Sequence, residues 1–491
     1  MNMKNYFKVL SVTLIGAMSL QSCTDLTEPV YDRIPADQFL QTDAQIAAAL
    51  GPAYGGLRGI TWDWFNPSEA TTDELIVPTR GGDWYDGGDW LHYANHTWGP
   101  QHGPINGCWG FIFGNISQIN QLIPVVESNI SAVSELKAVR AFYYFLAIDA
   151  FGNVPIVTDL ASANGGTKSR SEVYSFIKTE LETAIPNLNT GKAYSRMTKD
   201  AATMLLAKLK INAKVYSGTA DWQGAYDAAN AVITSSNGWS LAANTLDNFK
   251  VNNEGSTENI WTIPYDNFKA GGLNFQMRTL HYANSQTYGL SNSPWNGFCT
   301  YADFYNTFDA ADKRSAMWLV GQQYAADGTA LTDAKGAPLA FDPNFTKDRM
   351  TDADPEFQRA GARSQKYEIQ RNNPNGDQSN DYVVFRLADA IMMRAEAAFQ
   401  LGNTAQALAD VNTIRTRSGM PALTSITLND IYNERGREFA WEGWRRNDMI
   451  RFDKFSTARK FMAVTDKTRE LFPIPQARLD ANPNLVQNPG Y

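Results

Sequence analysis

Aromatic side chains stand beside polar ones in two long stretches of the sequence that have little helical periodicity, residues 61–104 and 239–380. These aromatic residues include, in chain order, Trp62, Trp64, Trp84, Tyr85, Trp90, Tyr282, Tyr288, Trp295, Phe298, Tyr301 and Trp318. A sugar offers a C–H face that stacks on a flat ring and hydroxyls that bind Asp, Asn or Arg, so this mixture is typical of an oligosaccharide site. Any one Trp is explained equally well as loop core, because Trp is usually largely buried. The cluster as a whole predicts the ligand site on these loops, since long irregular loops are uncommon unless functional.

The first stretch also contains residues with metal-binding chemistry: His92, His96, His102, Asp83, Asp86 and Asp89. An i, i+4 histidine spacing suits zinc on a helix, but glycines surround these histidines, so we expect hydrogen-bonding loop histidines and no metal site. The three aspartates are candidates for a structural calcium ion, although their spacing is not that of an EF-hand loop. The sequence has no Gly-rich phosphate loop, GxSxG elbow or HExxH motif, so no other cofactor is expected.

Acidic and basic residues alternate between residues 434 and 451, which at first suggests catalytic carboxylates. Glu434, Glu438 and Glu442 follow one another at one-turn spacing with arginines between them, which is typical of an ion-paired helix face. A glycosidase needs two carboxylates about 5 to 10 Å apart that face one sugar, and spacing along one helix does not provide this. The sequence therefore predicts a binding protein and not an enzyme.

Helical periodicity is strongest in four blocks that must position these loops: residues 134–150, 198–218, 221–238 and 382–418. Ser134, Thr198 and Asp221 are expected to cap the first three. Antiparallel helices joined by a few residues form hairpins whose apolar faces need a neighbouring hairpin. In the last block Ala395 and Ala407 flank Gly402, which resembles the tetratricopeptide pattern, whereas residues 198–238 fit an ordinary amphipathic hairpin equally well.

The first residues are typical of an exported lipoprotein. Lys4 and Lys8 flank a short polar start that precedes an apolar run, residues 9–20, which is shorter than the roughly 20 apolar residues of a membrane span. Residues 20–23, Leu-Gln-Ser-Cys, resemble a lipobox, so we expect a signal peptide over residues 1–22, lipidation of Cys23 and a flexible acidic tether over residues 23–38. Residues 24–28, with Asp25 and Glu28, resemble the acidic signal that sends lipoproteins of the Bacteroidetes group to the outer face, so we expect an outer-membrane, lipid-anchored protein that faces the exterior.

Composition limits the remaining classes. The chain of 491 residues is 43% hydrophobic and can bury a large core, as one big domain or as two or three interleaved ones. A net charge of -8 opposes binding to phosphate backbones, so no nucleic-acid partner is predicted. An oxidising envelope could join Cys108 to Cys299, but the sequence does not indicate whether they lie close together.

Long ordered motifs along nearly the whole mature chain resemble one family, the SusD-like (SusD/RagB) outer-membrane lipoproteins of Bacteroidetes. The motifs begin at Arg140 (RAFYYF), Phe151 (FGNVPI), Ala207 (AKLK), Tyr216 (YSG), Phe385 (FRLADAIMMRAEA), Asn412 (NTIRTRSG), Glu434 (ERGREF), Glu442 (EGWRRND), Leu471 (LFPIP) and Gln487 (QNPGY).

The resemblance implies a mainly α fold: a tetratricopeptide-type scaffold of about four helical pairs with a large loop-rich ligand-binding region. The expected parts are a helical region, 39–238, with a binding loop at about 61–104, a loop-rich insertion, 239–380, and a tetratricopeptide-like region with the family tail, 381–491. The implied function is capture of oligosaccharide or polysaccharide, without catalysis, and delivery to a SusC-like TonB-dependent transporter. Peptide or glycopeptide capture by the same fold, and an envelope scaffold that binds no nutrient, are the alternatives.

Within the resemblance, residues 78–88 resemble a loop of glycan-binding members in which a Trp supplies a stacking plate. We assign that role to Trp84, and the polar and aromatic residues beside it and in the second stretch extend the expected site. The predicted glycan-binding residues are Trp84, Trp295, Trp318, Arg80, Asp83 and Asn296.

Overall fold

The computed structural model describes residue 40 and residues 42–162 and 164–491. The predicted signal peptide, Cys23 and the tether therefore lie outside the described residues. Residues 48–491 form one compact unit. Among the described helices, none is both long and apolar enough to cross a membrane.

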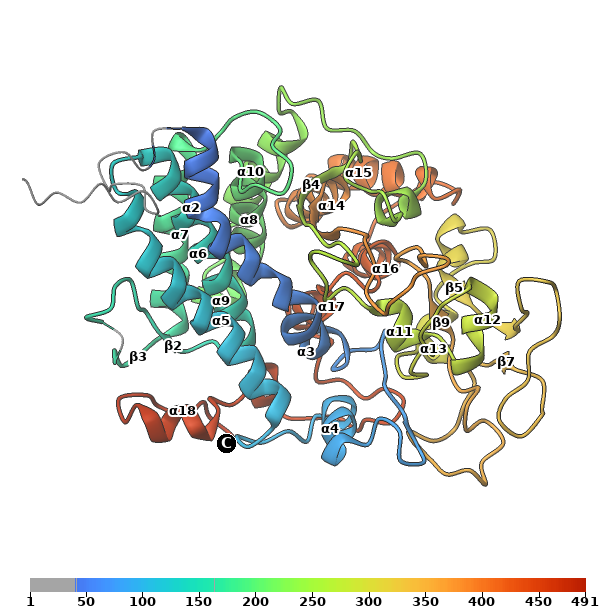
Figure 1. Ribbon diagram of the computed structural model, residues 1–491. Coiled ribbons are helices and arrows are strands. Elements are labelled where there is room, and N and C mark those ends of the chain that lie inside the picture. The colour runs from blue at the N-terminus through green and yellow to red at the C-terminus, as the bar shows by residue number, and fades with distance from the viewer. Residues whose placement is uncertain (1–39, 41, 163) are drawn as a thin grey trace, which may run out of the picture. The chain divides into compact units, whose positions relative to one another are not determined.

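The unit is mainly helical, which confirms the predicted fold class (Figure 1). The α-helices of the described chain are α2 (Asp43–Gly56), α3 (Phe65–Glu69), α4 (Asp89–Asn95), α5 (Gly103–Leu122), α6 (Ile130–Ala150), α7 (Arg170–Ala184), α8 (Lys199–Ile211), α9 (Ala213–Ser217), α10 (Trp222–Ile233), α11 (Phe275–Thr279), α12 (Ser285–Tyr288), α13 (Ala302–Tyr305), α14 (Leu387–Gln400), α15 (Thr404–Arg417), α16 (Leu428–Phe439), α17 (Arg445–Arg451) and α18 (Gln476–Ala481).

The long helices pack side by side in one row. The order of neighbours is α5, α6, α7, α8, α10, α14 and α15. α14 lies against α10 although residues 234–386 separate the two helices in the chain, so the row continues across the loop-rich segment (Figure 1). Each helix thereby covers the apolar face of the next, as tetratricopeptide-type scaffolds require.

Helix starts follow the expected capping chemistry with one correction. The side chains of Thr198 and Asp221 accept hydrogen bonds from the backbone N–H groups of Ala201 and Gly224, as predicted. α6 begins earlier than expected, because Asn129, and not the buried Ser134, supplies the cap. Asn at this position satisfies an N–H group that has no partner within the helix.

The hairpin of α14 and α15 has the tight approach that its small residues predict. Ala395 and Ala407 are fully buried, and Gly402 adopts a φ of 83° in the turn between the helices. Glycine reaches this left-handed conformation without the steric penalty of a Cβ atom, which allows a turn of so few residues.

Residues 234–386 contain short helices and short strands rather than long regular elements. The strands of the whole described chain are β1 (Thr79–Arg80), β2 (Val154–Pro155), β3 (Thr167–Lys168), β4 (Asn259–Ile263), β5 (Trp318–Leu319), β6 (Gly321–Gln322), β7 (Ala340–Phe341), β8 (Arg349–Met350), β9 (Arg363–Ser364) and β10 (Tyr382–Arg386). The longest pair is β4 with β10, which run antiparallel with Tyr382 opposite Ile263. This pair joins an early part of the loop-rich segment to its end, directly before α14. The domain boundaries given for this segment stay a prediction.

A buried ion-pair network fastens the loop-rich segment to α16 and to the turn that follows it. Arg386 of β10 contacts carboxylate oxygens of Glu258 at 2.8 Å, Glu438 at 2.6 Å and Glu442 at 2.7 Å. Arg314, from the loop-rich segment, reaches Glu438 at 2.9 Å. The predicted ion pairing is confirmed, but most partners come from distant segments, and Glu442 lies beyond the end of α16.

The two cysteines that follow Cys23 are both buried and free. Cys108 lies in α5, whereas Cys299 follows the segment that packs on the Trp84 loop. Cys108 and Cys299 therefore form no disulfide in this structure.

Candidate functional site

The loop that carries Trp84 is held in place by backbone hydrogen bonds. β1 pairs in parallel with β8 at its start. Arg80 and Asp83 then exchange two backbone N–H···O bonds of 3.0 Å, which close a tight turn. Gly81 takes a φ of 65° in this turn, where a side chain would be strained. The turn brings an exposed Asp83 and a half-buried Trp84 to the surface.

Three features fix the indole of Trp84. The residue has a φ of 59°, an unusual conformation for a bulky side chain. Its Nε1–H donates to the carbonyl oxygen of Trp295 at 2.7 Å. The ring also lies directly against the backbone of Gly297, where an added Cβ would stand 2.3 Å from Cε2 of the indole. The plate is therefore held by two loops that are far apart in the chain.

Trp295, the second predicted plate, lies beside Trp84. Its side chain is 38% exposed, and its ring centroid lies 6.4 Å from that of Trp84 with 48° between the planes. The backbone N–H groups of Trp295 and Gly297 donate to carbonyl oxygens of α11 at 2.6 and 2.8 Å, which ties this loop to the α11 helix. We call Trp84 and Trp295 the tryptophan pair. The structure thus brings together two of the three predicted plates.

A polar edge borders the tryptophan pair. The hydroxyl of Tyr282, a partly exposed residue, donates to a carboxylate oxygen of Asp83. Burial, together with this hydrogen bond, raises the pKa of Tyr282 to about 12, so the phenol stays protonated at neutral pH. Asp83 keeps further acceptor capacity for a ligand hydroxyl. Tyr282 was noted among the loop aromatics but was missed as a site residue, because only the folded chain brings residues 83 and 282 together.

The aromatic surface continues beyond the pair. Trp62 is 45% exposed, and its ring meets the edge of buried Trp90 at 6.3 Å between centroids. Trp90 in turn contacts Trp84 at 5.4 Å. The guanidinium of Arg278 lies 4.5 Å over the Trp62 ring. Trp62 is therefore an exposed aromatic residue, linked to Trp84 through the buried Trp90, that the sequence reasoning did not select as a site residue.

Arg80 and Asn296, predicted as hydrogen-bonding partners of the ligand, are buried. Arg80 donates to the carbonyl oxygens of Gly297 at 3.0 Å and Ala360 at 2.9 Å. The side chain of Asn296 accepts from Arg363 at 2.7 Å. The prediction for both residues is corrected: their polar atoms bind the protein and join the loops that support the tryptophan pair, so they do not face a ligand.

Trp318, the third predicted plate, is also corrected. Its side chain is only 6% exposed and packs edge-on against Phe308 at 5.6 Å and Trp441 at 6.2 Å. The residue belongs to the core beneath the loop-rich segment, as buried Trp commonly does. It contributes no exposed plate to the pair, although it lines a cavity elsewhere in the loop-rich segment.

The histidines and aspartates of the first stretch have separate protein partners. Burial lowers the pKa of His96 to about 2, and its Nε2 lies 2.9 Å from the carbonyl oxygen of Thr71. Asp86 accepts from Trp90 Nε1 at 2.7 Å, whereas Asp89 lies beside His102. Within residues 42–162 and 164–491, no group of three or more His, Cys, Asp or Glu side chains is arranged to hold a metal ion. Among the described residues, Asp83, Asp86 and Asp89 therefore do not come together as ligands for the suggested calcium ion.

Comparisons with known proteins match this chain to SusD and SusD-like proteins. Residues 257–491 match the family model described as the SusD family. The chain is 25% identical to the starch-binding protein SusD of Bacteroides thetaiotaomicron, over 87% of this chain and 85% of that protein. It is 24% identical to the SusD-like protein P38 of Formosa agariphila, over 99% of both chains.

Solved structures agree in fold. A laminarin binding SusD-like protein superposes with a TM-score of 0.74 at 24% identity, covering 92% of this chain and all of that one. The surface glycan-binding protein A of Bacteroides thetaiotaomicron, in complex with laminarihexaose, gives 0.73 at 21% identity, covering 91% and 99%. These structures share the tetratricopeptide-like helical fold with this chain.

Proposed function

The chain is a SusD-like protein, and from this premise we propose that it binds a glycan at the cell surface through the tryptophan pair and the Asp83–Tyr282 edge. The observation that carries the proposal is the pairing of Trp84 with Trp295, two exposed or half-exposed indoles that separate loops hold rigidly. Relatives described as starch-binding and as bound to laminarihexaose support glycan as the ligand class.

The geometry favours a coiled glycan. Two plates tilted by 48° stack best on two sugar rings that are rotated relative to each other, whereas a flat ribbon offers successive rings in one plane. Asp83 lies at the edge of the pair, where ring hydroxyls project, and its carboxylate accepts hydrogen bonds from them. We therefore expect coiled α- or β-glucans to bind more tightly than straight β-1,4-linked chains.

The proposal includes no catalysis. Glu434 and Glu438 are buried and bound by arginines, so they are not available to a sugar. The exposed carboxylate of Asp83 accepts from Tyr282, and a glycosidase would need a second carboxylate about 5 to 10 Å away on the same sugar. Relatives described as binding proteins support a role in capture.

Anchoring and delivery complete the proposal. The expected lipid on Cys23 would hold the protein on the outer membrane, facing the exterior, with a SusC-like TonB-dependent transporter as the recipient of the glycan. Several acyl chains give stable attachment where a single chain is marginal. Retention of the wild-type chain in the membrane fraction, and release of a Cys23→Ser variant, would test the anchor.

Calorimetric titration of the purified protein tests the ligand. The panel contains starch, laminarin, xylan, mannan and cellulose oligosaccharides together with peptides. We expect one coiled glucan to bind without product formation, and Trp84→Ala and Trp295→Ala each to weaken that binding. Phe268→Ala is the matched control, because Phe268 is 76% exposed and has no aromatic partner among the described residues. A response to peptides alone, or glycan binding that survives both tryptophan variants, would overturn the proposal.

A further inference from the structure

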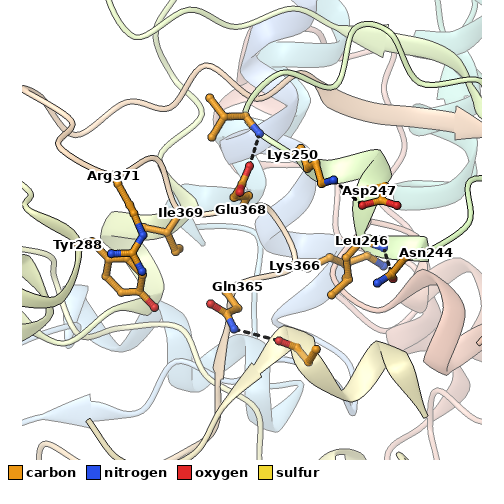
Figure 2. Close-up of a pocket in the computed structure, with 12 residues that line it drawn as sticks. Asn244, Leu246, Asp247, Lys250, Tyr288, Gln365, Lys366, Glu368, Ile369 and Arg371 are labelled. Atoms are coloured by element: carbon orange, nitrogen blue, oxygen red, sulfur yellow. Dashed lines mark hydrogen bonds and ion pairs between the residues drawn. The ribbon is translucent and has the colours of Figure 1, made fainter. Parts of the chain in front are cut away.

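Two neighbouring cavities in the loop-rich segment share one wall, formed by Tyr288 and Arg371. The first has a volume of about 490 Å³ and the second about 480 Å³, both within the size range of small-molecule sites. Figure 2 shows the first cavity, with Arg371 and Tyr288 together on one side of it. Neither cavity is lined by a residue of the tryptophan pair or its polar edge.

Arg371 is exposed yet held in one orientation. Its guanidinium lies 4.9 Å over the ring of Tyr288, and Nη1 donates to the carbonyl oxygen of Thr287 at 3.0 Å. Nε and Nη2 have no acceptor among the described residues. A planar guanidinium with one edge free is suited to bidentate recognition of a carboxylate.

Charge distinguishes the two sides of this wall. The first cavity is also lined by two carboxylates, Glu368 and Asp247, and Asp247 pairs with Lys250 at 2.7 Å. The ammonium of Lys366 is bound by Glu442 and two backbone carbonyl oxygens, so it is not free for a ligand. An anion entering this cavity would meet the carboxylate of Glu368, an exposed residue that accepts a backbone hydrogen bond from Val251 at 2.9 Å (Figure 2).

The second cavity has the opposite character. Of the described residues that line it, Arg371 alone is charged. The amide nitrogens of Gln322 and Gln323 donate to backbone carbonyl oxygens, which leaves their amide oxygens as acceptors for a ligand hydroxyl. Tyr324 is 51% exposed and able to stack on a ring. An Arg, an exposed aromatic residue and amide groups around one cavity match the carboxylate, the C–H face and the hydroxyls of an acidic sugar.

We propose that this second cavity is a separate binding site for a uronate residue of a glycan, with Arg371 on the sugar carboxylate and Tyr324 on the ring. The inference rests on the proposed function only in taking a saccharide as the ligand. It implies that the protein holds an acidic branch or block at a place distinct from the tryptophan pair.

Trisaccharides of glucuronate, galacturonate, mannuronate and guluronate, each beside its carboxyl-reduced form, test the proposal by calorimetry. The protein used is the Trp84→Ala, Trp295→Ala double variant, which removes binding at the tryptophan pair. We expect at least one uronate trisaccharide to bind, its carboxyl-reduced form to bind at least tenfold more weakly, and Arg371→Gln to weaken binding by about tenfold to a hundredfold.

Two further variants make the result specific. Arg371→Lys keeps the charge and loses the planar fork, so binding should be intermediate. Arg349→Gln is the matched control, because Arg349 is likewise exposed and lies 5.1 Å over the ring of Tyr85, and it should leave uronate binding unchanged.

The outcomes separate this inference from the proposed function. Lack of uronate binding, or uronate binding that Arg371→Gln leaves unchanged, overturns the second site. Uronate binding that depends on Arg371 in the double variant supports the second site, even where Trp84→Ala leaves the binding of neutral glucans unchanged. Unchanged binding of neutral glucans in Trp84→Ala would contradict only the role proposed for the tryptophan pair.

Discussion

Gly297 decides where the Trp84 plate lies, and its replacement by alanine is a sharp test of the site. A Cβ at this position would stand 2.3 Å from Cε2 and 2.4 Å from Cζ2 of the indole, whereas ordinary contacts begin at 3.4 Å. The ring must therefore move by about 1 Å or more. Nε1 would lie 2.7 Å from the same Cβ, so the hydrogen bond to Trp295 cannot survive in place.

Gly297→Ala should weaken glycan binding more than it lowers the free energy of unfolding. Aromatic anchors at binding sites typically contribute about 2 kcal/mol or more, which is about a thirtyfold loss of affinity. Loss of one neutral hydrogen bond lowers the free energy of unfolding by about 1 kcal/mol. Gly297 does not have a positive φ, so alanine adds no backbone strain and reduces the entropy of the unfolded chain. The two effects on stability partly cancel.

Titration with the glycan that the wild-type protein binds, beside a urea unfolding curve, measures both quantities. Gly82→Ala is the control in the same site, because a Cβ there meets nothing within 4 Å and the φ is not positive. It should bind like the wild type. A Gly297→Ala protein that binds the glycan within twofold of the wild type, while Trp84→Ala loses binding, would refute the argument that contact with Gly297 fixes the plate.

Three further predictions follow from the hydrogen bonds and pKa shifts. Tyr282→Phe removes the donor to Asp83 and should weaken glycan binding by about 0.5–1.5 kcal/mol in calorimetry, with a normal unfolding curve. Although burial alone raises the pKa of Glu438, its arginine partners hold that pKa well below the ordinary value, so this carboxylate stabilises the fold above about pH 4.5 and loses that effect as the pH falls. Glu438→Gln removes the buried negative charge that Arg314, Arg386 and Arg417 share, so their positive charges are less well compensated, and the free energy of unfolding at pH 7 should fall by about 3–5 kcal/mol in urea titration; an unchanged midpoint would contradict this. Burial raises the pKa of Glu74 to about 7. Protonated Glu74 therefore stabilises the fold fully below about pH 4.5, and this stabilisation is lost as the pH rises through 7. Glu74→Gln should reduce this loss of stability with rising pH in unfolding curves.

Local patterns predicted the scaffold well. Thr198 and Asp221 cap their helices, and the small residues Ala395 and Ala407 mark a close helix crossing, because capping and helix approach depend on residues near one another in the chain. The cap of α6 was predicted five residues late, at Ser134 instead of Asn129, because Asn129 lies outside the apolar pattern that located the helix.

The site was predicted in part. Trp84 and Trp295 face one surface as expected, and Trp318 does not, because burial of a loop Trp depends on packing partners such as Trp441 that sequence spacing does not identify. Arg80 has the residue type of a ligand partner, yet its acceptors come from residues 297 and 360. The type of a polar side chain in a loop indicates what it can bind, whereas only the fold determines whether protein or ligand supplies the partner.

The helical row that continues from α10 to α14 has a kinetic consequence. Contact between these helices requires the chain to close a loop that contains the whole segment from Ile233 to Leu387. Closing a long loop costs conformational entropy before the contact contributes any stabilising free energy, so non-local pairs of this kind slow folding. Helices α5 to α10 need only neighbours along the chain and can assemble first. The loops that carry Trp295 and Arg371 become ordered only when the second half of the row joins the first, so the capacity to bind a ligand should be acquired last during refolding.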